Sequence, residues 1–309
     1  LSAHVQIGRG RAALAIVLAS LFWGTTGTTA TFLPDSVSPF ATGAATMGVG
    51  GLLLFATAPR LSLGVLRDRA TRHWAAIGGI GVFVYPLAFY TGMDLAGVAI
   101  GNVVALGTGP IVTALLEWLV DRHPLSVRWA VATVLALGGM VLVSTVRHPG
   151  ESGSAVLPGV LFGLLAGVAY GLYTYASGRI VTSGASSRGA MGAVFGCGAV
   201  LLLPVLLALG APLLTDARSI GIAAYLALGP TLVAYLLVGV ALRALRSSTV
   251  TVIALLEPVF ATVLAVAVVG ERLEPLAWAG LVAILAGIIV LVTARPPRSE
   301  TRAPLESDA

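Results

Sequence analysis

One carboxylate lies deep inside an apolar stretch of this sequence, next to a proline. The stretch runs from Thr249 to Val269, and Glu257–Pro258 lies near its middle. In a helix, the roughly 10 residues from the polar start near Ser247 to Glu257 span ~15 Å, about half of a ~30 Å hydrocarbon layer. A carboxylate at that depth is costly and normally faces a cavity or a polar partner. This spacing therefore indicates a functional acid in a membrane.

The proline adds an unpaired backbone group at the same place. Pro258 removes one helical hydrogen bond and frees a carbonyl, and within a membrane that carbonyl needs a polar partner inside the protein. The stretch Gly107-Thr-Gly-Pro110 places a second proline 148 residues earlier. We predict that Pro110 and Pro258 break their helices as kinks, which open the helices around a cavity and serve gating. Gly109 stands where the first half would carry the acid, so we expect the chemistry at Glu257.

Other polar and aromatic side chains lie within apolar stretches at similar depth. The amide of Asn102 could bind an ammonium or a carboxylate group. We predict a substrate site near mid-membrane that is lined by Trp23, Tyr85, Asn102, Thr108, Tyr170, Tyr173, Tyr235 and Glu257. Glu257 is also the candidate proton site. The alternative readings are a structural acid that bonds groups freed by Pro258, an interhelical hydrogen bond for Asn102, and packing for the aromatic rings.

The composition places these residues in a membrane protein. Hydrophobic residues make up 57% of the chain and charged residues 10%, against about 25% charged residues in a soluble domain. Apolar runs of about 20 residues exclude a β-barrel, whose strands alternate apolar and polar over ~10 residues. We predict an all-α polytopic membrane protein with ten transmembrane helices. The predicted segments are 12–32, 38–58, 74–93, 96–119, 127–145, 157–178, 189–209, 217–240, 248–269 and 275–294.

The basic residues, all of them arginine, indicate the orientation. With ten spans both termini lie on one side, and the loops of that side hold all 18 arginines except Arg147, Arg218 and Arg272. The positive-inside rule then predicts a multi-pass protein of the cell membrane with both termini in the cytoplasm. Because this rule accounts for the net charge of +5, we expect no nucleic-acid binding.

The two halves of the sequence repeat each other. Trp23–Gly24 recurs as Tyr170–Gly171 at a shift of 147 residues, and Pro110 recurs as Pro258 at a shift of 148. Five segments recur in order, and because five is odd the two halves cross the membrane in opposite directions. We predict two inverted five-helix repeats, a plan common in secondary transporters, with the site near the midplane between the repeats.

Glycine recurs every fourth residue on one face of the sixth segment. The positions are Gly159, Gly163, Gly167 and Gly171. Such a stripe lets helix backbones approach closely, so we predict that it serves helix packing.

The second half also carries a family pattern. Ala254-Leu-Leu-Glu-Pro-Val259 is followed by an apolar run and then by Gly270-Glu-Arg-Leu273. This arrangement resembles the EamA-like members of the drug/metabolite transporter superfamily, whose pattern is a Pro-Val break followed by a Gly-Glu-Arg turn. The first half keeps Pro110-Ile-Val112 but has Arg122–His123 where Gly-Glu is usual. The resemblance implies export or exchange of small metabolites through a cavity among helices one, three, four, six, eight and nine.

The resemblance and the repeat together predict the organisation of the chain. We expect a cytoplasmic segment 1–11, a first EamA-like repeat 12–145, a linker 146–156, a second repeat 157–294 and a disordered cytoplasmic tail 295–309. The expected partners are a small-molecule substrate and the lipid bilayer; a homodimer is compatible with the sequence but not required. We expect no cofactor and no metal site, since the four histidines lie outside the segments or at their ends.

These features predict a secondary transporter that works by alternating access. The expected substrates are small metabolites such as amino acids or related amphipathic compounds, and proton coupling rests on Glu257. The alternatives are an intramembrane enzyme and a non-transporting sensor or scaffold. An enzyme would need a catalytic constellation within the bilayer, and no histidine accompanies Glu257. Phosphorylated substrates are disfavoured because no arginine or lysine lies at mid-membrane depth to pair with phosphate.

Overall fold

The chain folds into a bundle of membrane-length helices. The computed structural model describes residues 8–144, 155–264, 266 and 274–293, and within these ranges every regular element is helical. Nine of the described helical segments are long and apolar enough to cross a membrane, and a shorter apolar helix over Val127–Val143 supplies a tenth. The predicted all-α polytopic class is therefore confirmed. The predicted tail 295–309, most of the linker 146–156 and the Gly270–Leu273 turn lie outside the described residues.

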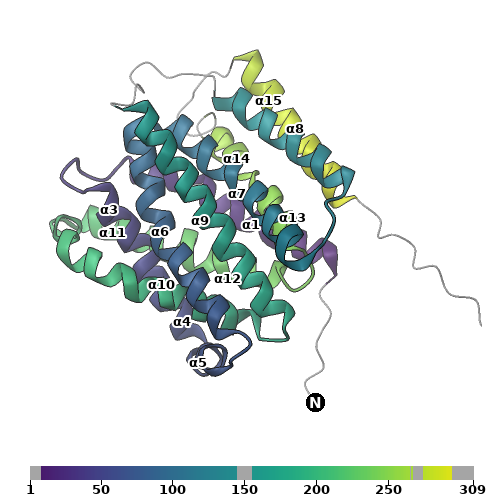
Figure 1. Cartoon of the computed structure of the whole chain (residues 1–309). Helices are drawn as coiled ribbons and strands as arrows, with labels where there is room; N and C mark the ends of the chain where they lie inside the picture. The colour runs from purple at the N-terminus through teal and green to yellow at the C-terminus, as the bar shows by residue number, and fades with distance from the viewer. Residues whose placement is uncertain (1–7, 145–154, 265, 267–273, 294–309) are drawn as a thin grey trace, which may run out of the picture.

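Within the described residues, the first half contributes four membrane-length spans, the shorter span Val127–Val143 and one additional helix, α5 (Pro59–Arg67); Figure 1 shows how they lie in the bundle. In chain order its elements are α1 (Arg9–Gly24), α2 (Thr26–Ala30), α3 (Pro39–Gly43), the π-helix η1 (Ala44–Val49), α4 (Gly50–Thr57), α5 (Pro59–Arg67), α6 (Arg72–Ala96), α7 (Val98–Asp121) and α8 (Val127–Ser144). Helix α5, which no predicted segment covers, buries Ser62 and Val65 and leaves Arg60 and Arg67 exposed.

The second half repeats the five spans with different interruptions. Its elements are α9 (Val156–Thr182), α10 (Ser187–Leu209), the 3-10 turn η2 (Ala211–Leu214), α11 (Ala217–Leu226), the π-helix η3 (Ala227–Val233), α12 (Ala234–Ala241), α13 (Ser247–Ala254), α14 (Glu257–Leu264) and α15 (Pro275–Val292). The start of α1 and the end of α15 line one groove, through Arg9 and Val292. We call this the terminal end of the bundle.

The glycine stripe of α9 brings three helices into close contact. A β carbon added at Gly171 would lie 2.8 Å from Val112 Cβ of α7, and one at Gly163 would lie 3.0 Å from Val104 Cγ1 of the same helix. At the other end of the stripe, a β carbon at Gly159 would overlap Ala96 of α6. The packing role predicted for the stripe is confirmed, since larger residues would force these helices apart.

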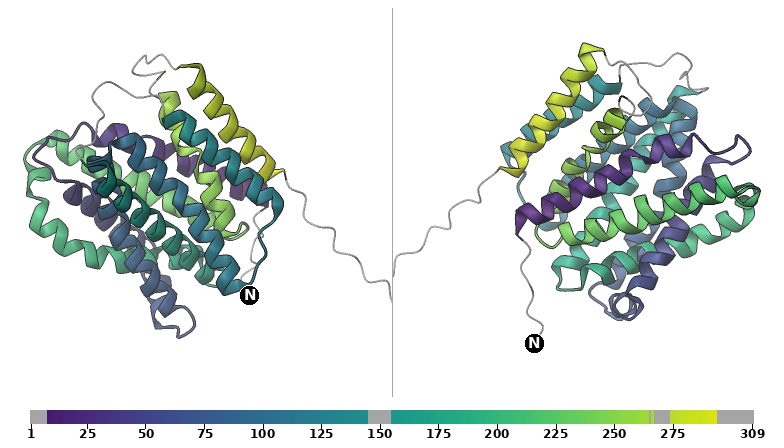
Figure 2. Two further views of the ribbon diagram at one scale, coloured as in Figure 1. Left: turned by 45° about the horizontal axis from the view of Figure 1, so that its top comes forward. Right: turned by 180° about the vertical axis from the view of Figure 1, so that it is seen from behind.

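Helices α8 and α15 form a separate pair at the edge of the bundle, as both Figure 1 and Figure 2 show. Glycines again allow the contact: a β carbon at Gly280 would lie 2.6 Å from the Gly139 carbonyl oxygen, and one at Gly287 would lie 2.6 Å from that of Ala132. The last helix of each repeat therefore packs mainly on its counterpart.

The two repeat-related prolines differ in their effect on the backbone. At the end of α13, the N–H groups of Leu255 and Leu256 bond three residues back, to Val252 (3.1 Å) and Ile253 (3.0 Å), and a new helix starts at Glu257. Helix α7, in contrast, continues through Pro110, so the break predicted there is wrong.

The surroundings of each proline explain this difference. Pro258 is the second residue of α14, where its missing N–H would have no helical partner in any case. Pro110 lies in the part of α7 that packs along the glycine stripe of α9, and the Thr113 hydroxyl bonds the Gly109 carbonyl at 2.8 Å. Packing on both sides of Pro110 keeps α7 in one piece.

Candidate functional site

A cavity lies among the central helices, at the level where the span α13–α14 is interrupted. The space free of protein atoms in the cavity and at its mouth is about 520 Å³, including the part that is open to solvent. Its lining residues are Trp23, Thr26, Thr46, Met47, Tyr85, Pro86, Phe89, Tyr90, Leu106, Tyr170, Tyr173, Pro230, Thr231, Tyr235 and Glu257. Both halves of the chain contribute, so the cavity lies between the two repeats.

Among the described residues that line the cavity, Glu257 is the only charged one. It is the first residue of α14, where the unpaired N–H groups of the helix start favour a negative charge. Helix α1 fixes the other side of this helix start: a β carbon at Gly24 would lie 3.0 Å from the Glu257 carbonyl oxygen and 2.8 Å from Phe260 Cβ. The break in the span and the close contact with α1 together hold the carboxyl group at the cavity.

Aromatic rings form most of the remaining wall. The hydroxyl oxygens of Tyr173 and Tyr235 lie 2.5 Å apart and share a hydrogen bond. The ring of Tyr85 lies 5.6 Å from that of Tyr173 and 5.9 Å from that of Tyr170, centre to centre. These contacts join α6, α9 and α12 through a continuous aromatic cluster, which is buried except for half-buried Tyr85.

Trp23 links the cluster to an interrupted helix. Its indole N–H donates to the Pro230 carbonyl at 2.9 Å, and its ring lies 5.3 Å from that of Tyr235. Pro230 lies in η3, where the Thr231 hydroxyl bonds the Leu226 carbonyl five residues back. Single π-helical turns often occur at functional sites because the widened turn redirects side chains and carbonyls.

The structure brings together six of the predicted site residues. Trp23, Tyr85, Tyr170, Tyr173, Tyr235 and Glu257 all line the cavity. Asn102 and Thr108 are not part of this lining: the Thr108 hydroxyl bonds the Val104 carbonyl at 2.7 Å, and Asn102 Oδ1 is buried without a hydrogen-bond partner within the described residues. Pro110 also lies outside the lining, whereas Pro258 directly follows Glu257.

The prediction missed residues from the two π-helices. Thr46 and Met47 come from η1, and Pro230 and Thr231 come from η3. The cavity thus includes the second span in addition to the six that the family resemblance implies. The Gly229–Pro230 pair within an apolar segment was an available signal for η3, whereas the sequence around Thr46 carries no comparable mark.

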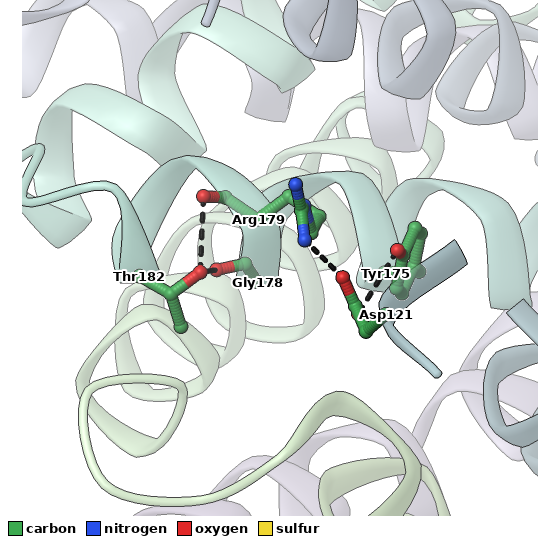
Figure 3. Close-up of polar contacts among 5 residues, drawn as sticks. All are labelled: Asp121, Tyr175, Gly178, Arg179 and Thr182. Atoms are coloured by element: carbon green, nitrogen blue, oxygen red, sulfur yellow. Dashed lines mark hydrogen bonds and ion pairs between the residues drawn. The ribbon is translucent and has the colours of Figure 1, made fainter. Parts of the chain in front are cut away.

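A second polar cluster joins the repeats at the terminal end. Asp121, the last residue of α7, pairs with the guanidinium group of Arg179 and accepts a hydrogen bond from the Tyr175 hydroxyl at 3.0 Å (Figure 3). The Arg179 guanidinium also lies over the ring of Trp74, 5.4 Å from its centre. One turn earlier in α7, Glu117 accepts hydrogen bonds from Ser248 of α13. The cavity wall and this cluster are therefore separate sites on the same helices.

Within the part of the chain that the structure describes, no three histidine, cysteine, aspartate or glutamate side chains gather closely enough to hold a metal ion. What the central cavity offers chemically is one carboxyl group, several hydroxyl groups and the faces of aromatic rings.

These features define a polytopic helical membrane protein with a cavity between two repeats. The profile of the EamA-like transporter family matches residues 10–145 and 157–293. The chain belongs to this family, within the drug/metabolite transporter superfamily, and is a transporter rather than an enzyme.

Individual relatives agree with this assignment. The chain is 32% identical over 296 residues to a Bacillus subtilis (strain 168) protein named "Uncharacterized transporter YwfM", covering 93% of this chain and 95% of that one. A Clostridium kluyveri protein named "Uncharacterized transporter" is 30% identical over 170 residues, 52% of each chain. A crystal structure of a protein at 22% identity superposes with a TM-score of 0.74 over 92% of this chain and 96% of its own, which supports the fold alone.

Proposed function

We propose that this protein is a secondary transporter that exports or exchanges small amphipathic compounds bearing a cationic amine, with amino acids and their relatives as the first candidates. It works by alternating access across the cell membrane, with both termini in the cytoplasm. The observation that carries the proposal is the position of Glu257, a lone carboxyl group in a cavity walled by aromatic rings.

The lining favours a positive charge on the substrate. Aromatic faces attract cations, and Trp23, Tyr85, Tyr170, Tyr173 and Tyr235 provide such faces around one acid. None of the described residues that line the cavity is an arginine, lysine or histidine, so a substrate carboxylate would rely on hydroxyl groups, such as those of Thr26 or Thr231. The Thr26 hydroxyl is buried and has no hydrogen-bond partner within the described residues, which leaves it free to bond a substrate.

The proposal includes proton coupling, which rests on Glu257 as the one acid among the described lining residues. The carboxyl group of Glu257 can be neutralised by a proton or by the ammonium group of a substrate, but not by both at once. An unneutralised charge in a buried cavity is costly. The protein would therefore switch between its inward-facing and outward-facing conformations only with either a proton or the substrate bound at Glu257. Alternating occupancy of this kind exchanges protons for substrate and would use an inward proton gradient to drive export.

Purified protein in proteoliposomes tests this function. We would impose a pH gradient with the acidic side inside and follow uptake of a labelled tetraalkylammonium compound and of labelled aromatic amino acids. The tetraalkylammonium ion is a sharp probe because, unlike a primary amine, it cannot carry protons across the lipid by itself. We expect saturable uptake that collapses with the gradient, and no uptake in protein-free liposomes.

The variant Glu257→Gln separates the roles of the carboxyl group. We expect gradient-driven uptake to disappear for both probes. The affinity for an amino acid should fall roughly 10-fold to 100-fold, since a hydrogen bond between its ammonium group and a charged carboxylate contributes about 1.5–3 kcal/mol; the tetraalkylammonium ion, which has no N–H group, loses only the attraction between charges. Glu274→Gln, which removes an exposed carboxyl group at the start of α15, is the matched control and should transport normally. Wild-type rates in Glu257→Gln would mean that Glu257 is structural, and equal uptake of uncharged analogues would exclude a cationic substrate class.

A further inference from the structure

A second and larger hollow lies at the terminal end, between the α8–α15 pair and the rest of the bundle. The space free of protein atoms in and over it is about 1450 Å³, including the part that is open to solvent. The start of α1, the α7–α8 loop, α8, the α12–α13 loop, α13 and the last turn of α15 all contribute to it. We call it the terminal groove; it is separate from the central cavity, with which it shares no lining residue.

The terminal groove gathers positive charge from three different elements. Arg9 begins α1, Arg246 precedes α13, and Arg128 lies in the first turn of α8. All three are exposed, and none has an ion pair with any residue of the described ranges. Glu117 is the only acid among the described residues of the lining, and it is buried and already bonded to Ser248. The groove therefore presents three guanidinium groups for which the described residues supply no matching anion.

Beside these charges the lining includes apolar side chains as well as the buried polar pair Glu117 and Ser248. Ile253 is fully buried at the groove, and Leu291 of α15 and Ala13 of α1 lie beside it. Trp129 is half-buried and donates its indole N–H to the Ser248 carbonyl at 3.3 Å, an arrangement typical of aromatic side chains at a membrane interface. Leu125 and Val292 are exposed at the mouth.

We propose that the terminal groove binds an anionic phospholipid, with the phosphate group between Arg9, Arg128 and Arg246 and an acyl chain along the apolar wall. Guanidinium groups pair with phosphate oxygens in a bidentate way, and basic hollows between transmembrane helices are suited to anionic headgroups. A free phosphate ion would use the arginines but leave the apolar wall empty. A neutral lipid would fill the wall but leave the three positive charges unmatched.

The positive-inside rule explains why arginines lie at this end, but not why three of them surround one apolar hollow. Arg60, Arg67 and Arg72, in and after α5, are equally exposed and do not line the groove. They provide a control with the same change of charge. The predicted site is thus distinguishable from general attraction to an anionic membrane.

Native mass spectrometry of the detergent-purified full chain tests the proposal. Wild-type protein would be titrated with phosphatidylglycerol, phosphatidylcholine and inorganic phosphate in separate arms. The variant Arg9→Gln/Arg128→Gln/Arg246→Gln would be compared with the control Arg60→Gln/Arg67→Gln/Arg72→Gln. We expect phosphatidylglycerol to bind the wild type and the control alike, and the groove variant roughly 100-fold more weakly, since each arginine adds to the attraction of an anionic lipid.

A further variant keeps the arginines and changes the mouth. Leu125→Glu adds a negative charge at an exposed position of the lining, so it should fold normally and weaken phosphatidylglycerol binding. Three results would overturn the proposal. The first is an equal loss of phosphatidylglycerol binding in the groove and control triple variants, and the second is phosphatidylcholine binding as tight as that of phosphatidylglycerol. The third is displacement of bound phosphatidylglycerol by millimolar inorganic phosphate as effectively as by added lipid. The last result would identify a phosphate site without a lipid.

Discussion

The carboxyl group of Glu117 holds both polar groups of Ser248, accepting hydrogen bonds from its backbone N–H at 2.9 Å and from its hydroxyl at 2.6 Å. Glu117 lies near the end of α7 in the first repeat, and Ser248 is the second residue of α13 in the second repeat. The acid thereby takes the place of an N-cap side chain for α13, since the preceding Arg246 makes no side-chain cap. The contact closes the terminal end of the bundle between the two repeats.

The first prediction concerns the energy of this contact. Glu117→Ala and Ser248→Ala should each destabilise the protein, because each leaves a buried polar group without its partner, at a cost of about 1–3 kcal/mol. The double variant should lose less than the sum of the two, since both substitutions remove the same interaction. Thermal unfolding of the four proteins in detergent measures this coupling. Additive losses would show that the two residues do not interact.

The same contact also bears on transport. If the repeats separate at the terminal end during alternating access, the Glu117–Ser248 bonds must break in each cycle. Ser248→Ala removes the 2.6 Å bond and keeps the backbone bond, so it should favour the conformation open at that end. The accessibility of the neighbouring Ser247, tested as a cysteine in a Cys197→Ser background, should rise. Unchanged labelling in Ser248→Ala would argue against a gate at this position.

The second prediction concerns the glycine stripe. Gly171→Ala should cost about 1–3 kcal/mol, because the added β carbon would lie 2.8 Å from Val112 Cβ and α9 would have to move away from α7. Gly138→Ala is the matched control, since a β carbon there meets no atom within 4 Å. It should leave stability unchanged or raise it by up to about 1 kcal/mol. Equal melting temperatures for the two variants would contradict the packing role of the stripe.

The third prediction is a pH dependence outside the membrane spans. Asp216 caps α11, accepting hydrogen bonds from the Ser219 hydroxyl at 2.7 Å and from the Ser219 N–H at 2.9 Å. These bonds lower the pKa of its carboxyl group below the ordinary value of 3.8. The cap therefore contributes stability above pH 3.8, and this contribution is lost as the pH falls through the lower, folded-state pKa.

Asp216→Asn tests that cap. Asparagine is also a good N-cap, so the variant should match the wild type near neutral pH to within a small difference. As the pH falls from 5 to below 3.8, the melting temperature of the wild type should fall more steeply than that of the variant. Parallel melting curves over this range would mean that ionisation of Asp216 does not contribute.

The local sequence pattern predicted those features of this protein that depend on a single side chain or a single helix. The length of the apolar segments predicted the number of spans, because each must cross the same hydrocarbon thickness. Depth and residue type selected Glu257 and five aromatic residues that meet at one cavity. The spacing of Gly159, Gly163, Gly167 and Gly171 predicted a contact face because a helix places every fourth residue on one side.

Tertiary structure alone decided which helices pack together and whether a proline interrupts its helix. Pro110 and Pro258 hold equivalent places in the repeat. Only the span that contains Pro258 is divided, into α13 and α14, because α7 is held along its length by α9. Asn102 and Thr108 matched the expected depth but lie outside the cavity lining, since depth does not specify the direction of a side chain.

The Glu117–Ser248 contact, the Asp121–Arg179 pair and the terminal groove join residues from opposite halves of the chain. Such partners depend on how the helices pack against one another, and no spacing within a single helix encodes them.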